Sequence, residues 1–165
     1  MNTRSFIFRL LITALLASGL AVAHAQSTDE PYEEVTPVPA RFEALGDGTV
    51  LDKNTNLTWT GKNRAGDIGW PEAQSYCQSM GDGWSLPSTD DLISLYTPGI
   101  ASQDGCLGKQ SCNITPLIEV TGLVFWSAEI DASGAWYVYF VDGKKYSVDS
   151  SSNPQGKRAL CVRRP

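Results

Sequence analysis

The sequence predicts an α+β domain in which two helices pack on a mostly antiparallel, twisted sheet with long loops. Residues 135–141 alternate their side chains at period two around Trp-Tyr-Val-Tyr-Phe, which is typical of a β-strand. Asp142-Gly143 follows at once and is a hairpin signal, so the next strand is expected to run antiparallel to this one. Residues 71–80 and 88–96 instead place apolar side chains three and four positions apart, which indicates helices.

Both predicted helices have clear ends. Pro71 suits the first position of a helix, and Gly81 is a typical residue just past the last turn. Cys77 lies on the apolar face of this first helix and is expected to point into the core. In the second helix, Ser88 and Asp91 form a Ser-x-x-acid pattern, in which each side chain satisfies a free backbone N–H group. We therefore expect a rigid entry into this helix.

The remaining strands are predicted from short runs of β-branched and aromatic residues bounded by turn residues: 41–45, 49–52, 57–60, 84–86, 124–129, 145–148 and 159–163. One turn also resembles a metal loop, because Asp52, Asn54 and Asn56 match the first three ligand positions of a calcium-binding loop. However, Leu57 stands where that loop needs glycine, and Asn63 where it needs a bidentate glutamate. We therefore interpret the segment as a hairpin turn and predict neither a metal nor another cofactor.

The N-terminal residues 1–25 have the layout of a secretory signal peptide. Two arginines precede an apolar run that ends in Ala23-His24-Ala25, and cleavage is expected after this tripeptide. The run is too short to span a membrane comfortably, so we expect no membrane insertion after cleavage. Residues 26–40 are acidic and proline-rich and are predicted to be a flexible leader, which leaves residues 41–165 as the folded domain.

Cleavage would remove His24, which is the one histidine of the sequence. A Ser-His-Asp triad, a Cys-His pair and a histidine-ligated zinc site are then excluded within the chain. Loss of the two arginines also lowers the formal net charge from −5 to −7, so we do not expect a nucleic-acid partner for this exported, acidic protein. The basic side chains gather toward the C-terminal end as Lys144, Lys145, Lys157, Arg158, Arg163 and Arg164. These residues are either solvent-exposed lysines on an edge strand together with a solvated C-terminal tail, or a basic patch that binds an anionic polymer.

Four cysteines in an exported chain indicate two disulfides, and three pairings are possible. We favour Cys77–Cys161 as a long closure and Cys106–Cys112 as a local clasp. Chain entropy allows at most ~4.6 kcal/mol of stabilisation for the long bond and ~2.4 kcal/mol for the short one. If all four cysteines are paired, no thiol remains to act as a nucleophile.

Several motifs occur together in one order: Asp47–Asp52, Asn56–Trp59, Trp70 with Ala73 and Tyr76-Cys77, Gly83–Leu92, Phe125–Ser127, Ala135–Gly143 and Cys161–Arg163. Over about residues 41–164 they resemble the Lcl C-terminal domain family, which comprises bacterial exported domains related to C-type lectin-like and formylglycine-generating-enzyme folds. The resemblance implies a C-type lectin-like fold for residues 41–165, in which a cysteine of the first helix bridges to the last strand. It also implies a bacterial protein of the periplasm or the outside of the cell.

We expect a non-catalytic binding or adhesion module that recognises a glycan or another protein at the cell envelope. The contacts are expected to come from long loops, over 98–122 and 142–157, and from exposed aromatic side chains. The candidate ligand-binding residues are Trp136, Tyr137, Tyr139, Lys144, Lys145, Asn153, Lys157 and Arg158. Two alternatives stay open: a periplasmic inhibitor or protective protein that binds a partner, and an enzyme of the formylglycine-generating kind, which would need reactive thiols.

Overall fold

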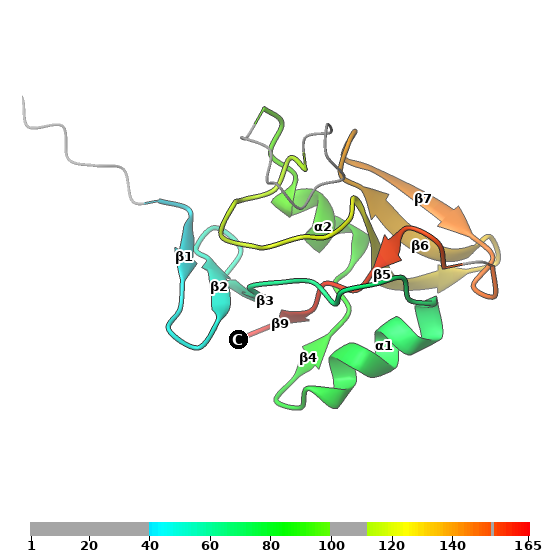
Figure 1. Ribbon diagram of the computed structural model, residues 1–165, viewed down its shortest axis with the longest axis horizontal. Coiled ribbons are helices and arrows are strands. Elements are labelled where there is room, and N and C mark those ends of the chain that lie inside the picture. The colour runs from blue at the N-terminus through cyan, green and yellow to red at the C-terminus, as the bar shows by residue number, and fades with distance from the viewer. Residues whose placement is uncertain (1–39, 100–111, 153) are drawn as a thin grey trace, which may run out of the picture. The chain divides into compact units, whose positions relative to one another are not determined.

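The described part of the chain contains two β-sheets (Figure 1). The computed structural model describes residues 40–99, 112–152 and 154–165. The first sheet has the strand order β1-β2-β3-β9-β4, and the second has the order β7-β6-β5-β8. The strands are β1 Phe42–Ala44, β2 Thr49–Asp52, β3 Leu57–Thr60, β4 Trp84–Ser85, β5 Val124–Asp131, β6 Gly134–Tyr139, β7 Lys144–Val148, β8 Lys157–Arg158 and β9 Val162–Arg163. The predicted α+β class is confirmed, and the expected sheet is divided into two.

The signal peptide expected over residues 1–25 lies outside the described residues. The same holds for the leader expected over 26–40, except for its last residue. Both assignments therefore stay predictions. The folded domain expected over 41–165 contains all the strands and helices that the structure describes.

The first sheet is an N-terminal meander closed by the C-terminal strand. β2 and β3 pair as the expected hairpin, with Asp52 opposite Leu57. The Asp52 side chain accepts a hydrogen bond from the Asn54 N–H at 3.0 Å, which is the geometry of an Asx turn. β9 pairs antiparallel with both β3 and β4. The C-terminal end of the chain is thereby built into the N-terminal sheet.

The second sheet is the β5-β6-β7 meander with a short parallel strand at one edge. β6 follows the expected period-two pattern toward its end, where Val138 and the following Phe140 are buried. Gly143, at φ 69°, lies in the turn into β7. At the opposite edge, β8 runs parallel to β5 with Lys157 opposite Val124. The two residues of β8 carry no strand pattern of their own, and the sequence did not predict this strand.

The chain crosses from the second sheet to the first through a buried connection over 159–161. The Thr60 N–H donates to the Cys161 carbonyl at 3.0 Å, and the Cys161 N–H donates to Thr60 Oγ1 at 3.3 Å. These bonds hold the connection against the end of β3. The expected strand over 159–163 is therefore shortened to its last part, Val162–Arg163, which belongs to the first sheet.

The helices are α1, Trp70–Ser79, and α2, Thr89–Leu95. The capping box of α2 is confirmed, because the Asp91 N–H donates to Ser88 Oγ at 3.0 Å and the Ser88 N–H donates to Asp91 Oδ2 at 2.8 Å. Cys77 of α1 points into the core and has no exposed surface, as expected. The helix patterns in the sequence therefore place both elements to within a residue or two.

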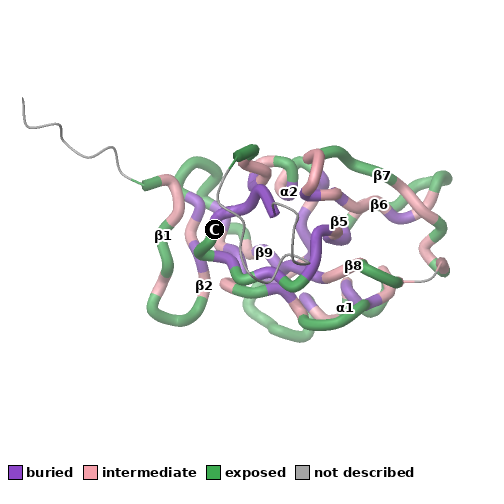
Figure 2. Tube along the Cα trace, turned by 45° about the horizontal axis from the view of Figure 1, so that its top comes forward, coloured by how far each residue is buried: buried purple, intermediate pink, exposed green. Residues whose placement is uncertain are grey.

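Two apolar clusters form the core, and the buried segments run through the middle of the domain (Figure 2). One cluster includes Leu92 of α2 together with Trp59, Phe125 and Phe140. The other joins α1 to the second sheet and includes Trp126. The two aromatic neighbours Phe125 and Trp126 lie on opposite faces of β5, so each face of this strand faces a different cluster.

The loop expected over 98–122 contributes to the core in its described second half. Residues 100–111 lie outside the described residues. Beyond them, Ile114, Ile118 and Val120 are fully buried in the cluster around α2. Asn113 fixes this segment to the second sheet, because its Nδ2 group donates to the Phe140 carbonyl at 2.9 Å. Much of this half of the segment is packed like a core element, and its exposed positions are residues 116, 117, 119 and 121.

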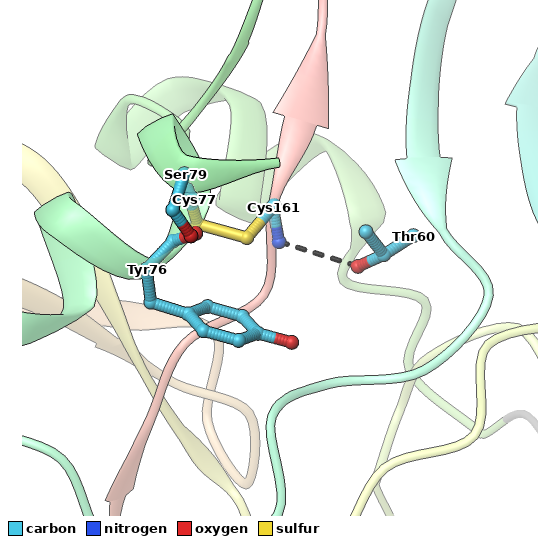
Figure 3. Close-up of a disulfide and its surroundings, with 5 residues drawn as sticks. All are labelled: Thr60, Tyr76, Cys77, Ser79 and Cys161. Atoms are coloured by element: carbon cyan, nitrogen blue, oxygen red, sulfur yellow. Dashed lines mark hydrogen bonds between the residues drawn. A yellow bond between two sulfur atoms is a disulfide. The ribbon is translucent and has the colours of Figure 1, made fainter. Parts of the chain in front are cut away.

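The Cys77–Cys161 disulfide is confirmed (Figure 3). It joins α1 to the connection before β9 across a sequence separation of 84, with the Cα atoms 5.5 Å apart. Both cysteines have no exposed surface. The Cys106–Cys112 clasp stays a prediction: Cys112 is described and buried, but Cys106 lies outside the described residues.

Candidate functional site

The pairing register of the second sheet places some of the predicted ligand-binding residues on one face. Side chains that lie directly opposite each other in neighbouring strands share a face of the sheet. Lys144 lies opposite Tyr139, which lies opposite Val124, which in turn lies opposite Lys157. Two residues further along the register, Tyr146 lies opposite Tyr137 on this same face. Two tyrosines and two lysines predicted from the sequence are therefore brought together.

Two further predicted residues, Trp136 and Lys145, belong to the opposite face. Lys145 lies opposite the buried Val138, and its Nζ atom is 5.4 Å from the centre of the Trp136 ring. The Trp136 Nε1–H donates to Asp131 Oδ2 at 3.0 Å, which fixes the indole near the tip of the β5-β6 hairpin. The predicted set therefore does not form one site, because the pleat of β6 sends Trp136 and its neighbour to different faces.

Arg158 and Asn153 do not join the tyrosines either. Arg158 forms an ion pair with Asp67, and its side chain retains only 13% exposure. It therefore ties the segment before α1 to β8 and has a structural role. Asn153 lies outside the described residues, so its assignment as a ligand-binding residue stays a prediction.

An open hollow of about 470 Å³ lies on the face that carries the tyrosines. It is lined by Val124, Tyr137, Tyr139 and Tyr146, and we call it the tyrosine hollow. Tyr146 was not among the residues predicted for the site, and it is 38% exposed. The alternation of Lys144–Val148 after the hairpin was the available signal, because it puts Tyr146 two residues from Lys144 and on the same face.

Tyr137 forms the fixed floor of the tyrosine hollow. Its ring stacks on that of Tyr146 at 5.8 Å and 26°, and meets the ring of the buried Trp126 edge-on at 5.9 Å. The Lys157 Nζ atom lies 5.5 Å from the centres of both the Trp126 and the Tyr137 rings. These contacts restrict the Tyr137 ring, so a ligand would find this part of the surface already organised.

Asp142 fixes the rim of the hollow. The Tyr146 hydroxyl donates to Asp142 Oδ2 at 2.6 Å, and the Lys144 N–H donates to Asp142 Oδ1 at 3.0 Å. The hydrogen bond from Tyr146 is the main cause that holds the pKa of Asp142 below its usual value. The same bond raises the pKa of the Tyr146 hydroxyl. At neutral pH the carboxylate is therefore charged and the phenol is protonated, which keeps the Tyr146 ring in place.

The hollow offers shape and aromatic surface, and the described residues around it supply no reactive set. The described residues of its lining are one aliphatic and three phenolic side chains. In the described chain, no group of three or more His, Cys, Asp or Glu side chains is arranged to hold a metal ion. Asp52, the first of the residues weighed as calcium ligands, instead pairs with Arg41 at 2.9 and 2.6 Å. What this surface can do is bind a ligand by packing and by hydrogen bonds to the phenols.

The fold and the hollow define a disulfide-bonded α+β domain with an aromatic hollow on its second sheet. None of the helices that the structure describes is long and apolar enough to cross a membrane. The family model of the Lcl C-terminal domain matches residues 48–163, so the chain belongs to the Lcl C-terminal domain family. No curated protein sequence matches the chain.

Proposed function

We propose that this protein is a non-catalytic binding module that acts outside the cytoplasm and recognises a glycan or a protein surface through the tyrosine hollow. The observation that carries this proposal is that β6 and β7 bring Tyr137, Tyr139 and Tyr146 together around one open hollow, which Val124 of β5 also lines. Tyrosine is enriched at binding surfaces, because it combines an apolar ring with a polar hydroxyl and buries a large contact area at a low cost in side-chain conformational entropy.

Two further observations support a location outside the cytoplasm. The sequence begins with the layout of a signal peptide, which predicts export. The Cys77–Cys161 disulfide is of the kind that persists in oxidising compartments. The same bond removes both cysteines from the thiols that an enzyme of the formylglycine-generating kind would need, which favours binding over catalysis.

Substitution in the tyrosine hollow tests this function. The purified protein and its Tyr139→Ala/Tyr146→Ala variant are applied to glycan arrays and to arrays of envelope proteins. We expect the wild type to be retained on a defined subset of spots and the variant to lose about tenfold or more in apparent affinity, because the central aromatic contacts carry most of the binding free energy. Met80→Ala serves as the control, since Met80 is 41% exposed and lies outside the hollow.

The fold of each variant is checked by its unfolding midpoint in urea. A wild type that is retained on no spot of either array contradicts the proposal. So does retention that the double substitution leaves unchanged while Met80→Ala weakens it.

A further inference from the structure

We propose that the ligand is an extended, acidic peptide segment of a partner protein, which adds as a further strand to the outer edge of β7 and places alternate side chains over the tyrosine hollow. This inference rests on the proposed binding function and names its ligand class. It is carried by the open edge of β7, by the charges along that edge, and by the kind of side chains that line the hollow.

The two edges of the second sheet differ. The edge at β8 is covered, because the Ile68 N–H donates to the Lys157 carbonyl at 3.1 Å and brings the segment before α1 against this strand. β7 is the other outer strand, and within the described chain no segment pairs with its outer side. An outer strand presents unpaired N–H and C=O groups, and an extended peptide can complete the ladder there.

The charges on β7 fit an acidic strand. Lys144 and Lys145 are both exposed, and as neighbours in a strand they point to opposite faces of the sheet. Positive charge is therefore available on both sides of the edge. Lys157 adds a further positive charge on the face of the hollow. An added strand of alternating acidic and apolar residues would turn its apolar side chains to the hollow and its carboxylates to the face of Lys145.

Acidic residues flank this positive edge at both ends. Asp142 precedes β7, and Asp149 follows it. Both carboxylates are ionised at neutral pH. The hydrogen bond from the Tyr146 hydroxyl lowers the pKa of Asp142 further, and the hydrogen bond from the Ser151 hydroxyl lowers that of Asp149. The full sequence carries a formal net charge of −5, so the protein as a whole repels a long polyanion. A short acidic segment that spans β7 alone avoids this repulsion.

The lining of the hollow also favours a peptide over a sugar. A glycan needs many hydrogen-bonding partners for its hydroxyls, and unmade hydrogen bonds are costly. Among the described residues, the lining provides Val124 and three phenols, and the Tyr146 hydroxyl is already engaged by Asp142. An extended peptide makes its main-chain hydrogen bonds at the edge of β7 and needs only apolar contact over the rings.

The test uses three defined eight-residue probes with blocked ends: alternating Glu and Val, alternating Lys and Val, and the Glu-Val peptide N-methylated at every second residue. Each is titrated into isotopically labelled protein, and the backbone amide shifts are followed by NMR. We expect the Glu-Val peptide to shift the amides of 144–148 with a Kd on the order of 1 mM. The Lys-Val peptide should bind about tenfold more weakly because it loses the attraction between opposite charges. The N-methylated peptide should bind about tenfold more weakly because it loses main-chain hydrogen bonds to β7.

A charge-reversal variant tests whether the lysines of β7, and not the net charge of the protein, determine which peptide binds. Lys144→Glu/Lys145→Glu should weaken the Glu-Val peptide about tenfold or more and make the Lys-Val peptide the preferred probe. Lys53→Glu is the matched control, because Lys53 is an exposed lysine at the end of β2 in the other sheet. This control should change neither titration beyond about twofold.

Three results overturn the inference: no shifts up to about 5 mM peptide, equal binding of the two charge types, or shifts confined to residues outside β7 and the hollow. Retention of a glycan that depends on Tyr139 and Tyr146, without any peptide binding, overturns the inference and leaves the proposed function standing. Failure of both the arrays and the peptides overturns both.

Discussion

Asp52 has no exposed surface, and its negative charge is compensated by a specific set of hydrogen-bond partners. Arg41 donates to both carboxylate oxygens, and the Asn54 N–H donates to Oδ1. Burial by itself raises the pKa of Asp52, but the hydrogen bonds from Arg41, Thr55 and Asn54 outweigh it, so the pKa lies below its usual value. Arg41 also donates to the Ser94 carbonyl at 2.7 Å, which connects the first sheet to α2.

Replacing Asp52 with asparagine should therefore cost more than a surface substitution. We expect Asp52→Asn to lower the free energy of unfolding by about 2–3 kcal/mol, because the half-buried Arg41 loses its counter-charge. Urea unfolding followed by tryptophan fluorescence measures the change. The control is Glu43→Gln, which removes an exposed partner of Lys53 and should cost less than about 1 kcal/mol. Equal losses in the two variants would contradict the role given to Asp52.

The same carboxylate predicts a pH dependence of stability. Because the pKa of Asp52 is lower in the folded than in the unfolded state, the unfolded state binds its proton first as the pH falls. Its contribution is fully present above the unfolded pKa of about 3.9 and is lost as the pH falls through the folded value. We expect the free energy of unfolding to decrease with acidification below about pH 5, and less steeply in Asp52→Asn. Parallel curves for the two proteins would argue against this assignment.

The turn between β6 and β7 shows how one glycine supports an element. Gly143 has φ 69°, and a Cβ atom at this position would lie 2.6 Å from the ring of Tyr96. The Tyr96 ring packs edge-on against Phe140 at 6.3 Å, so it cannot move without disturbing the core. The rim of the tyrosine hollow therefore depends on the absence of a side chain at this turn.

A pair of glycine substitutions separates backbone strain from the steric clash. Gly143→Ala should lower the free energy of unfolding by about 2–4 kcal/mol, because it adds both a left-handed alanine and an overlap with Tyr96. Gly156→Ala adds the strain without the overlap, since Gly156 has φ 77° with nothing within 4 Å of its would-be Cβ, and it should cost about 1 kcal/mol. Thermal and urea unfolding measure both. Similar losses of unfolding free energy in the two variants would show that the Tyr96 ring moves aside and that the overlap costs little.

At the scale of the whole molecule, the Cys77–Cys161 disulfide joins α1 to the connection before the last strand across 84 positions. Replacing both cysteines with serine should lower the free energy of unfolding by up to about 4.6 kcal/mol, because the unfolded chain regains the entropy of an open loop. Denaturant unfolding under non-reducing conditions measures the loss. The matched variant Cys106→Ser/Cys112→Ser should cost at most about 2.4 kcal/mol. A larger loss in the second variant would contradict the ranking of the two bonds.

Local features of this chain could be predicted from the sequence because they depend on neighbours a few residues apart. The capping box of Ser88 and Asp91 and the hairpin at Asp142-Gly143 are of this kind. Cys77 could be assigned to the core because helical spacing alone places it on the apolar face of α1. The family and the α+β class follow from the order of such local patterns along the chain.

The tertiary structure alone decided how these elements meet. It divided the strands into two sheets, because hydrogen bonds between Thr60 and Cys161 draw the C-terminal segment onto β3 from a distance of 101 positions. It also separated Trp136 from Tyr137 and added Tyr146 to the hollow, since the register between strands fixes which side chains share a face. The sequence determined most of the strand segments and which side chains alternate along them, but not the short β8. The sequence does not determine which side chains of neighbouring strands lie side by side. That depends on the register between the strands, which is the one that buries the apolar surface of the whole core.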